Sequence, residues 1–170
     1  MVNEGGGIQI NGKGAVIVTE TVQLDLNRNP DMKKADVEKE LQRTIGSTEV
    51  IWLKRGLARD YQDFGTRGHS DILAAFCNET TILYHDQQNP EHPDFIVSQE
   101  IKEVLEKTNY KLIPVPAPTI IYDEVGFVDY GYINHYVCNG AVIMCSFNDP
   151  QGDERAASIL ALAYPDRKIV

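Results

Sequence analysis

An internal repeat limits this chain to a small set of folds. Three times the sequence passes through a turn, an apolar run, an Asn-Pro or Asp-Pro break, an amphipathic helical pattern and a second apolar run. The central apolar runs align at Val16, Ile82 and Val142, which are 66 and 60 residues apart. Repeats of such length are typical of solenoids and propellers, whose units stack because none buries its sheet alone. A coincidental order within an ordinary α/β chain is the alternative.

Hydrophobic periodicity predicts one helix in each repeat. Apolar residues recur at helical spacing over about residues 34–44, 95–107 and 153–164, and charged residues fill the opposite face of the first helix. Gly46 is predicted to end that first helix, because glycine readily adopts the left-handed conformation found just after a helix. Each helix is therefore predicted to pack its apolar stripe on a sheet.

Turn and strand patterns complete each repeat. Turn chemistry at Asn11–Gly14, Phe76–Thr80 and Val137–Gly140 precedes the three central apolar runs, and shorter apolar runs follow the predicted helices. This order gives two strands, a helix and a third strand in each unit. We expect a single α/β domain over residues 1–170, made of about three ββαβ units at 4–60, 66–116 and 130–170.

A short segment at the start of the second unit contains the strongest candidate for chemistry. His69 follows Gly68 and is followed two residues later by Asp71, directly before an apolar run. If a strand begins at His69, both side chains project to one face, because alternate residues of a strand share a face. An imidazole beside a carboxylate combines acid–base chemistry with a group that binds cations. A turn histidine beside a solvated aspartate is the alternative.

The charge balance narrows the class of partner. The chain carries 16 Lys and Arg against 25 Asp and Glu, a formal net charge of −9. Nucleic acids bind basic surfaces, so we expect no nucleic-acid partner, whereas a cationic substrate is compatible with this charge. No apolar run reaches the roughly 18 residues of a membrane span, and the first residues lack the basic and apolar regions of a signal peptide. We therefore expect no membrane partner and a cytoplasmic protein.

Neither the cysteines nor the histidines form a recognisable disulfide or metal pattern. Cys77, Cys138 and Cys145 are odd in number and include no C-x-x-C pair, so we expect buried free thiols. A metal site is the remaining alternative, although a His-x-Asp pair is not a tight ligand spacing. Its candidate ligands are His69, Asp71, His85 and His92. We expect no bound metal.

Seven short motifs stand in the order found in agmatine deiminases. These enzymes belong with the porphyromonad-type peptidylarginine deiminases in the guanidino-group-modifying superfamily, which the chain resembles over essentially all 170 residues. The motifs are Glu4–Ile8, Asn27–Pro30, Val50–Leu53, Gly68–Asp71, Tyr132–Asn134, Asp149–Pro150 and Pro165–Lys168. The resemblance implies a pentein, in which five ββαβ blades surround a central channel, and this chain would contribute about three of them.

The resemblance also implies a reaction and its residues. The family hydrolyses a guanidinium C–N bond without a metal or organic cofactor, for example in the conversion of agmatine into N-carbamoylputrescine and ammonia on a route to putrescine. His69 is expected to shuttle protons, and Asp71 to bind the guanidinium through its paired oxygens. Glu4 is expected to lie beside the histidine as a third catalytic residue and to favour the protonated imidazole. Asn134 matches a substrate-binding position.

The sequence departs from the family pattern in three ways. The family nucleophile is a cysteine in a Gly-Gly-Gly-x-His-Cys element, which this sequence does not contain. A further guanidinium-binding aspartate belongs to family blades that precede Glu4. Agmatine deiminases usually have Asp-Glu-Thr-Asp-Gly-His, and here Gly65 and Arg67 replace two of those acids. Arg67 is therefore predicted to contact the substrate and to favour a carboxylate over a second amino group. Agmatine, free arginine and an arginyl peptide are therefore all candidate substrates.

Two hypotheses follow from these departures. The first is an amidine hydrolase of the agmatine deiminase type, present here as an incomplete chain that lacks the nucleophilic cysteine element. The second is a catalytically inactive pentein fragment that serves as a binding or structural module. Three of five blades leave sheet edges exposed, so both hypotheses predict a homo-oligomer or a completing chain along those edges.

Overall fold

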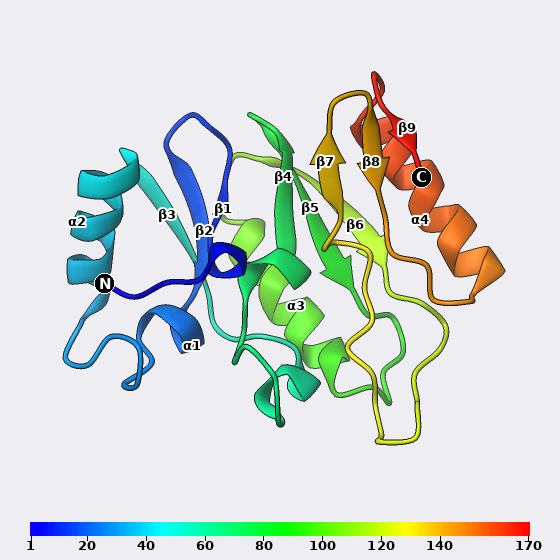
Figure 1. Cartoon of the computed structure of the whole chain (residues 1–170), viewed down its shortest axis with the longest axis horizontal. Coiled ribbons are helices and arrows are strands. Elements are labelled where there is room, and N and C mark those ends of the chain that lie inside the picture. Colours follow the sequence, from blue (N-terminus) through cyan, green and yellow to red (C-terminus); the bar gives the residue numbers. More distant parts are fainter.

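The computed structural model describes residues 1–170 and shows three small sheets side by side, each with a helix packed against it (Figure 1). Every sheet has three strands, in the orders β1-β2-β3, β4-β5-β6 and β7-β8-β9. The first two strands pair antiparallel, and the second and third pair in parallel across a helical connection. Three ββαβ units therefore follow one another along the chain, which confirms the α/β repeat predicted from the sequence.

The elements follow the same order in every unit. The first unit contains β1 (Gln9–Ile10), β2 (Ala15–Thr19), the short helix α1 (Glu20–Gln23), α2 (Lys34–Ile45) and β3 (Glu49–Leu53). The second contains β4 (Ala74–Asn78), β5 (Thr81–Asp86), α3 (Asp94–Leu105) and β6 (Lys111–Pro116). The third contains β7 (Tyr136–Cys138), β8 (Ala141–Ile143), α4 (Pro150–Ala163) and β9 (Lys168–Ile169). Three 3-10 helices lie outside the sheets, at Gly5–Gly7, Ala58–Tyr61 and Ser70–Ile72. No helix combines the length and the apolar character that a membrane crossing requires.

The middle sheet is buried on both faces, and this burial holds the units together. On β5, Ile82 belongs to one apolar cluster and its neighbour Leu83 to another, because successive side chains of a strand point to opposite faces. The first cluster joins this sheet to Leu53 of β3, and the second joins it to Leu160 of α4. Each of these clusters contains residues from two units, as expected for repeats that cannot bury their sheets alone.

The helices agree with the predicted ranges except at their ends. Helix α2 is followed by Gly46 in the left-handed conformation, at φ 69°, as predicted. Its apolar face is shorter than the pattern indicated, since Leu41 is buried but Ile45 is 47% exposed. Helix α4 begins earlier than predicted, at Pro150, because the Asp149 carboxylate caps it by accepting a hydrogen bond from the Gly152 N–H at 3.2 Å.

Two predicted turns are partly strand. β4 extends to Asn78 and β7 to Cys138, so the hairpins are tighter than the turns predicted at Phe76–Thr80 and Val137–Gly140. Only two residues separate the last paired residues of each hairpin, because cross-strand hydrogen bonding continues into the predicted turn. Gly140 supplies the positive φ, 78°, that such a short connection requires.

Candidate active site

The candidate site lies where the N-terminal segment meets the loop between β3 and β4. Glu4 directly precedes one 3-10 helix, and His69 directly precedes another. The two helices contact each other, and the Ser70 hydroxyl donates a hydrogen bond to the Gly6 carbonyl at 3.2 Å. Glu4 and His69, which are 65 positions apart in the sequence, are thereby neighbours.

His69 and Asp71 converge on the backbone of Gly6. A Cβ atom at Gly6 would overlap both the Nδ1 atom of His69 and the Oδ2 atom of Asp71. The lack of a side chain at Gly6 therefore lets the imidazole and the carboxylate lie together. The strand predicted to begin at His69 is wrong, because Ser70–Ile72 forms a 3-10 helix and β4 begins only at Ala74. The tight helical turn, and not strand alternation, places the two side chains side by side.

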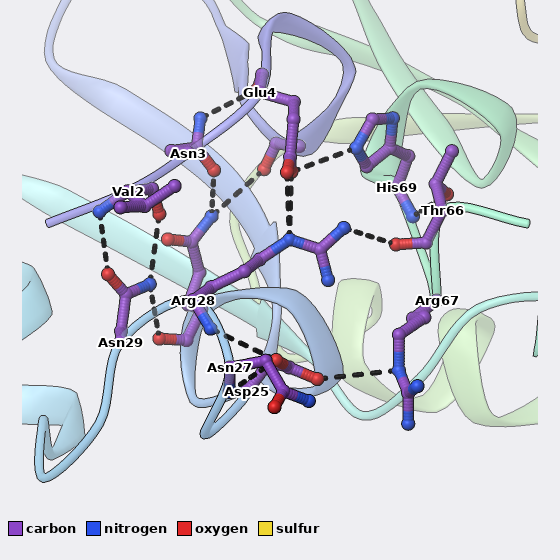
Figure 2. Close-up of polar contacts among 12 residues, drawn as sticks. Val2, Asn3, Glu4, Asp25, Asn27, Arg28, Asn29, Thr66, Arg67 and His69 are labelled. Carbon is purple, nitrogen blue, oxygen red and sulfur yellow. Dashed lines mark hydrogen bonds and ion pairs between the residues drawn. The ribbon is translucent and has the colours of Figure 1, made fainter.

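The Glu4 carboxylate is held between a guanidinium and an imidazole (Figure 2). Its Oε2 atom lies 3.2 Å from the His69 Nε2 atom, and the Arg28 Nε–H donates to both carboxylate oxygens, at 2.9 and 3.0 Å. The hydrogen bond from Arg28 lowers the pKa of Glu4 below its ordinary value, burial opposes this shift, and the bond with His69 adds to it. Glu4 therefore presents an anion to the imidazole.

Asp71 lies in a less solvated environment than Glu4. Burial raises the pKa of Asp71, and His69 acts in the opposite direction. The Asn134 Nδ2 atom lies 3.5 Å from the Asp71 Oδ2 atom, at the outer limit of a hydrogen bond. Asn134 is exposed and lies two residues before β7, the first strand of the third unit, so that unit reaches the site as well. Two carboxylates, an imidazole and an amide can together bind a planar cation and transfer its protons.

A buried carboxylate fixes the loop that carries His69. Asp60 accepts hydrogen bonds from the backbone N–H and the hydroxyl of Thr66 and from the backbone N–H of Gly68, each at 2.6 Å. The Gly68 carbonyl accepts a bond from the Thr19 hydroxyl at 2.6 Å. The Thr66 hydroxyl accepts one from the His69 N–H at 3.0 Å. Gly68 has a φ of 114°, a conformation that residues with a side chain rarely adopt, so this loop has little freedom.

Three residues of this arrangement were absent from the predicted site. Gly6 and Arg28 stand inside the motifs Glu4–Ile8 and Asn27–Pro30, which indicated their segments but not their contacts. Asp60 stands outside all seven motifs, and only its burial and its three hydrogen bonds identify it.

Arg67 is directed away from the imidazole. Its Nε atom lies 3.3 Å from the Asp25 Oδ2 atom, and Figure 2 shows this pair below Arg28, whereas Glu4 and His69 lie above it. The Asp25 side chain is only 8% exposed, while that of Arg67 is 57% exposed. The structure therefore brings Glu4, His69, Asp71 and Asn134 together but leaves Arg67 at the edge of the group.

None of the three cysteines is hydrogen-bonded to His69 or Asp71. The thiols of Cys77 and Cys138 are partly buried and donate to main-chain carbonyls of their own hairpins, at 3.6 and 3.5 Å. Burial raises the pKa of the Cys77 thiol. Cys145 is exposed, and its thiol donates to the Asn134 carbonyl at 3.4 Å. All three thiols are free, but the prediction that they are buried is wrong, because narrow three-stranded sheets leave their hairpin ends and loops accessible.

The four residues of the alternative metal site do not assemble. No three His, Cys, Asp or Glu side chains of the structure are grouped as metal ligands. His85 and His92 are both buried, and burial lowers the pKa of His85 to about 4. The Nδ1 atom of His92 accepts a hydrogen bond from the backbone N–H of Asp94 at 3.1 Å. These two histidines belong to the packing between β5 and the start of α3.

The chain is similar to proteins described as deiminases. The family described as Porphyromonas-type peptidyl-arginine deiminase matches residues 1–170. A Streptomyces coelicolor relative is 47% identical over 176 residues, which cover 99% of this chain and 52% of that relative. The agmatine deiminase of Medicago truncatula is 31% identical over 194 residues, which cover 100% of this chain and 51% of the plant protein.

Solved structures give the same result. An agmatine deiminase variant from C. jejuni, solved with its substrate bound, superposes with a TM-score of 0.90 at 31% identity. The superposition covers 98% of this chain and 49% of the C. jejuni chain. The present chain thus spans about half the length of the curated relatives it matches. Because the family match extends over all 170 residues, the chain belongs to the Porphyromonas-type peptidyl-arginine deiminase family.

Proposed function

We propose that this chain forms the guanidinium-binding and proton-transfer part of a hydrolase that cleaves a guanidinium C–N bond. One observation carries the proposal: the His69 imidazole has the Glu4 carboxylate 3.2 Å from Nε2 and the Asp71 carboxylate beside it over Gly6. A group that transfers protons therefore stands next to a carboxylate suited to a planar cation. The relatives named as agmatine deiminases support the same class of reaction.

Each residue has a separate task in this proposal. Asp71 accepts hydrogen bonds from the guanidinium, and Asn134 adds a further contact. A cysteine thiolate attacks the guanidinium carbon, the C–N bond breaks, and His69 gives its proton to the departing ammonia. His69 then takes a proton from the water that attacks the same carbon, which releases the thiolate and leaves a ureido product. The Glu4 carboxylate stabilises the protonated imidazole between these steps.

The proposal places the nucleophile outside these 170 residues. A nucleophilic cysteine reacts as its thiolate and needs an acid–base partner within hydrogen-bonding reach. Cys77, Cys138 and Cys145 have no hydrogen bond to His69, and burial raises the pKa of Cys77, which disfavours its thiolate. The relatives are about twice as long as this chain, so the same architecture has room for a further segment that supplies the thiolate.

The proposed substrate is agmatine or another guanidine derived from arginine. Agmatine would yield ammonia and N-carbamoylputrescine, a step toward putrescine. The exposed guanidinium of Arg67 favours a substrate with a carboxylate at its far end, since a carboxylate could replace Asp25 as its partner while a second ammonium would be repelled. Free arginine and an arginyl peptide are therefore the other candidate substrates.

Ammonia release tests the proposed reaction. We expect the protein, assayed together with the segment that supplies the thiolate, to release ammonia from at least one of agmatine, L-arginine and an arginyl peptide, with no added cofactor and in the presence of a metal chelator. Calorimetry on the same three compounds measures binding separately. Binding without ammonia from any of them would contradict hydrolysis and support the second candidate function, an inactive guanidinium-binding module, which the lack of a cysteine beside His69 favours.

We also propose that another chain or segment covers the third sheet, β7-β8-β9, and continues the row of blades toward a closed propeller. Tyr136, Val137 and Ile143 of β7 and β8 are 67%, 39% and 50% exposed, whereas β5, the strand of the middle sheet equivalent to β8, is almost entirely buried. Exposed apolar sheet faces of this kind favour association. Sedimentation is expected to give a mass above that of one 170-residue chain. A monodisperse monomer that unfolds cooperatively would contradict this proposal.

The proposed location is the cytoplasm. All three cysteines are free thiols, and Cys145 is exposed. Exposed free thiols persist in a reducing compartment and pair or oxidise in an oxidising one.

A further inference from the structure

The turn Asp25–Asn29 contacts both segments that meet at the site (Figure 2). On the N-terminal side, the Asn29 side chain accepts a hydrogen bond from the Val2 N–H at 2.6 Å and donates one to the Val2 carbonyl at 2.9 Å. On the other side, the Asp25 carboxylate pairs with Arg67 of the loop between β3 and β4, at 3.3 Å. The turn overlaps the Asn-Arg-Asn-Pro motif, to which the proposed reaction assigns no task.

Arg28 makes the central contact of this turn. Its Nε–H donates to both oxygens of Glu4, at 2.9 and 3.0 Å, and its Nη2 donates to the Thr66 carbonyl at 2.8 Å. The hydroxyl of the same Thr66 accepts the backbone N–H of His69 at 3.0 Å. One guanidinium therefore connects the Glu4 carboxylate to the loop that positions the imidazole.

The exposure of the Arg28 and Glu4 side chains shows which of the two is held in place by its surroundings. The Arg28 side chain is 15% exposed, whereas the Glu4 side chain is 42% exposed. A glutamate with that much contact with solvent has several accessible rotamers, and only some of them place its carboxylate against His69. A guanidinium presents its donors in a rigid planar fork, so the less exposed Arg28 selects among those rotamers.

The turn also fixes the backbone from which Arg28 projects. The Asp25 Oδ1 atom accepts hydrogen bonds from the N–H groups of Asn27 and Arg28, at 2.8 and 3.1 Å. The Asp25 side chain itself is only 8% exposed, so its carboxylate has a fixed position in the turn. Arg28 is therefore held at its backbone by Asp25 and at its guanidinium by Glu4 and Thr66.

We propose that Arg28 is a positioning residue that holds the Glu4 carboxylate against the His69 imidazole. Its effect on catalysis rests on the proposed function, but its effect on Glu4 and His69 does not. Arg28 acts through Glu4 and has no contact with His69 or Asp71 side chains among the hydrogen bonds of the site. A lysine could not replace it, because a single ammonium cannot span Glu4 and Thr66 in the way that two guanidinium nitrogens do.

Three variants of the purified protein test this role: Arg28→Met, Arg28→Lys and the control Arg43→Met. Arg43 is matched to Arg28, because it donates to Glu40 through Nε and Nη2 at 2.9 and 2.7 Å, but on the exposed face of α2. Carbon NMR follows the titration of the Glu4 carboxyl, and nitrogen NMR follows the His69 imidazole. Steady-state ammonia release, measured with the segment that supplies the thiolate present, gives kcat and KM for the same proteins.

The Arg28→Met protein is expected to differ in all three measurements. Arg28 lowers the pKa of Glu4, so its loss raises that pKa, and the Glu4–His69 pair breaks at a higher pH as the solution is acidified. The His69 Nε2 signal loses the mark of a carboxylate partner, and kcat falls by about 100-fold with KM changed by less than about threefold. Arg28→Lys keeps the charge but not the geometry, so kcat falls although the Glu4 titration moves less. Arg43→Met changes none of these.

Two results would overturn the role of Arg28. One is a folded Arg28→Met protein whose Glu4 and His69 signals match those of the wild type. The other, which decides the question if Arg28→Met does not fold, is an Arg28→Lys protein with wild-type signals and kcat. Perturbed Glu4 and His69 signals in a protein that never releases ammonia would support the positioning role and contradict the proposed function, so the two failures are distinguishable.

Discussion

Replacement of His69 by alanine is expected to lower the rate of ammonia release by about 100- to 10,000-fold, the usual contribution of a positioned acid–base group. Without the imidazole, no group donates a proton to the departing ammonia. No group beside Glu4 then accepts a proton from the attacking water. Agmatine binding, measured by calorimetry, is expected to weaken by less than about tenfold, because Asp71 still accepts the guanidinium hydrogen bonds. The loss therefore falls on kcat.

Added imidazole provides the control for this variant. If the alanine variant retains the site, imidazole enters the space left by the side chain and restores part of the turnover of His69→Ala. The same addition leaves the wild-type rate unchanged. Measurable turnover that is identical in the wild type and in His69→Ala would exclude His69 as the proton shuttle.

Replacement of Gly6 by alanine is expected to reduce turnover by about 100-fold, the effect of displacing reacting groups by about 1 Å. The added methyl group would overlap the His69 Nδ1 and Asp71 Oδ2 atoms, so both side chains must move apart. Agmatine affinity falls together with kcat, because Asp71 is displaced as well as His69. Steady-state ammonia release and calorimetry measure the two effects.

The adjacent glycine supplies a matched control for the Gly6 variant. A Cβ atom at Gly5 would meet no other atom within 4 Å, although Gly5 belongs to the same 3-10 helix. Gly5→Ala is therefore expected to keep wild-type turnover and affinity. Equal activity of the two alanine variants would show that His69 and Asp71 do not need to converge over Gly6.

Much of the fold could be predicted because the necessary information is local. The spacing of Val37 and Leu41 predicts the buried face of α2, and Gly46 predicts its end. The ends of the hairpins could not be predicted in the same way, since Asn78 becomes part of β4 by pairing with Thr81 across the turn. Strand ends depend on a partner strand, and the sequence of one segment does not reveal that pairing.

The site could be predicted in part, although the strand geometry on which the prediction rested is wrong. His69 and Asp71 do lie together, but through a 3-10 helix and not through a strand. The contacts that hold them are distant in sequence: Arg28 is 38 positions from Thr66, and Glu4 is 65 positions from His69. Local patterns can single out the residues of such a site, whereas the packing of separate segments determines which of them touch.

The placement of the site at the junctions between units has a consequence for its ancestry. Glu4 and Arg28 belong to the first unit, His69 and Asp71 lie where the first unit meets the second, and Asn134 leads into the third. No single unit contains the whole group, so duplication of one ancestral unit would multiply the scaffold without copying the chemistry. The reactive group can arise only after copies adjoin and diverge from one another, which makes it a property of their arrangement and not of any one copy.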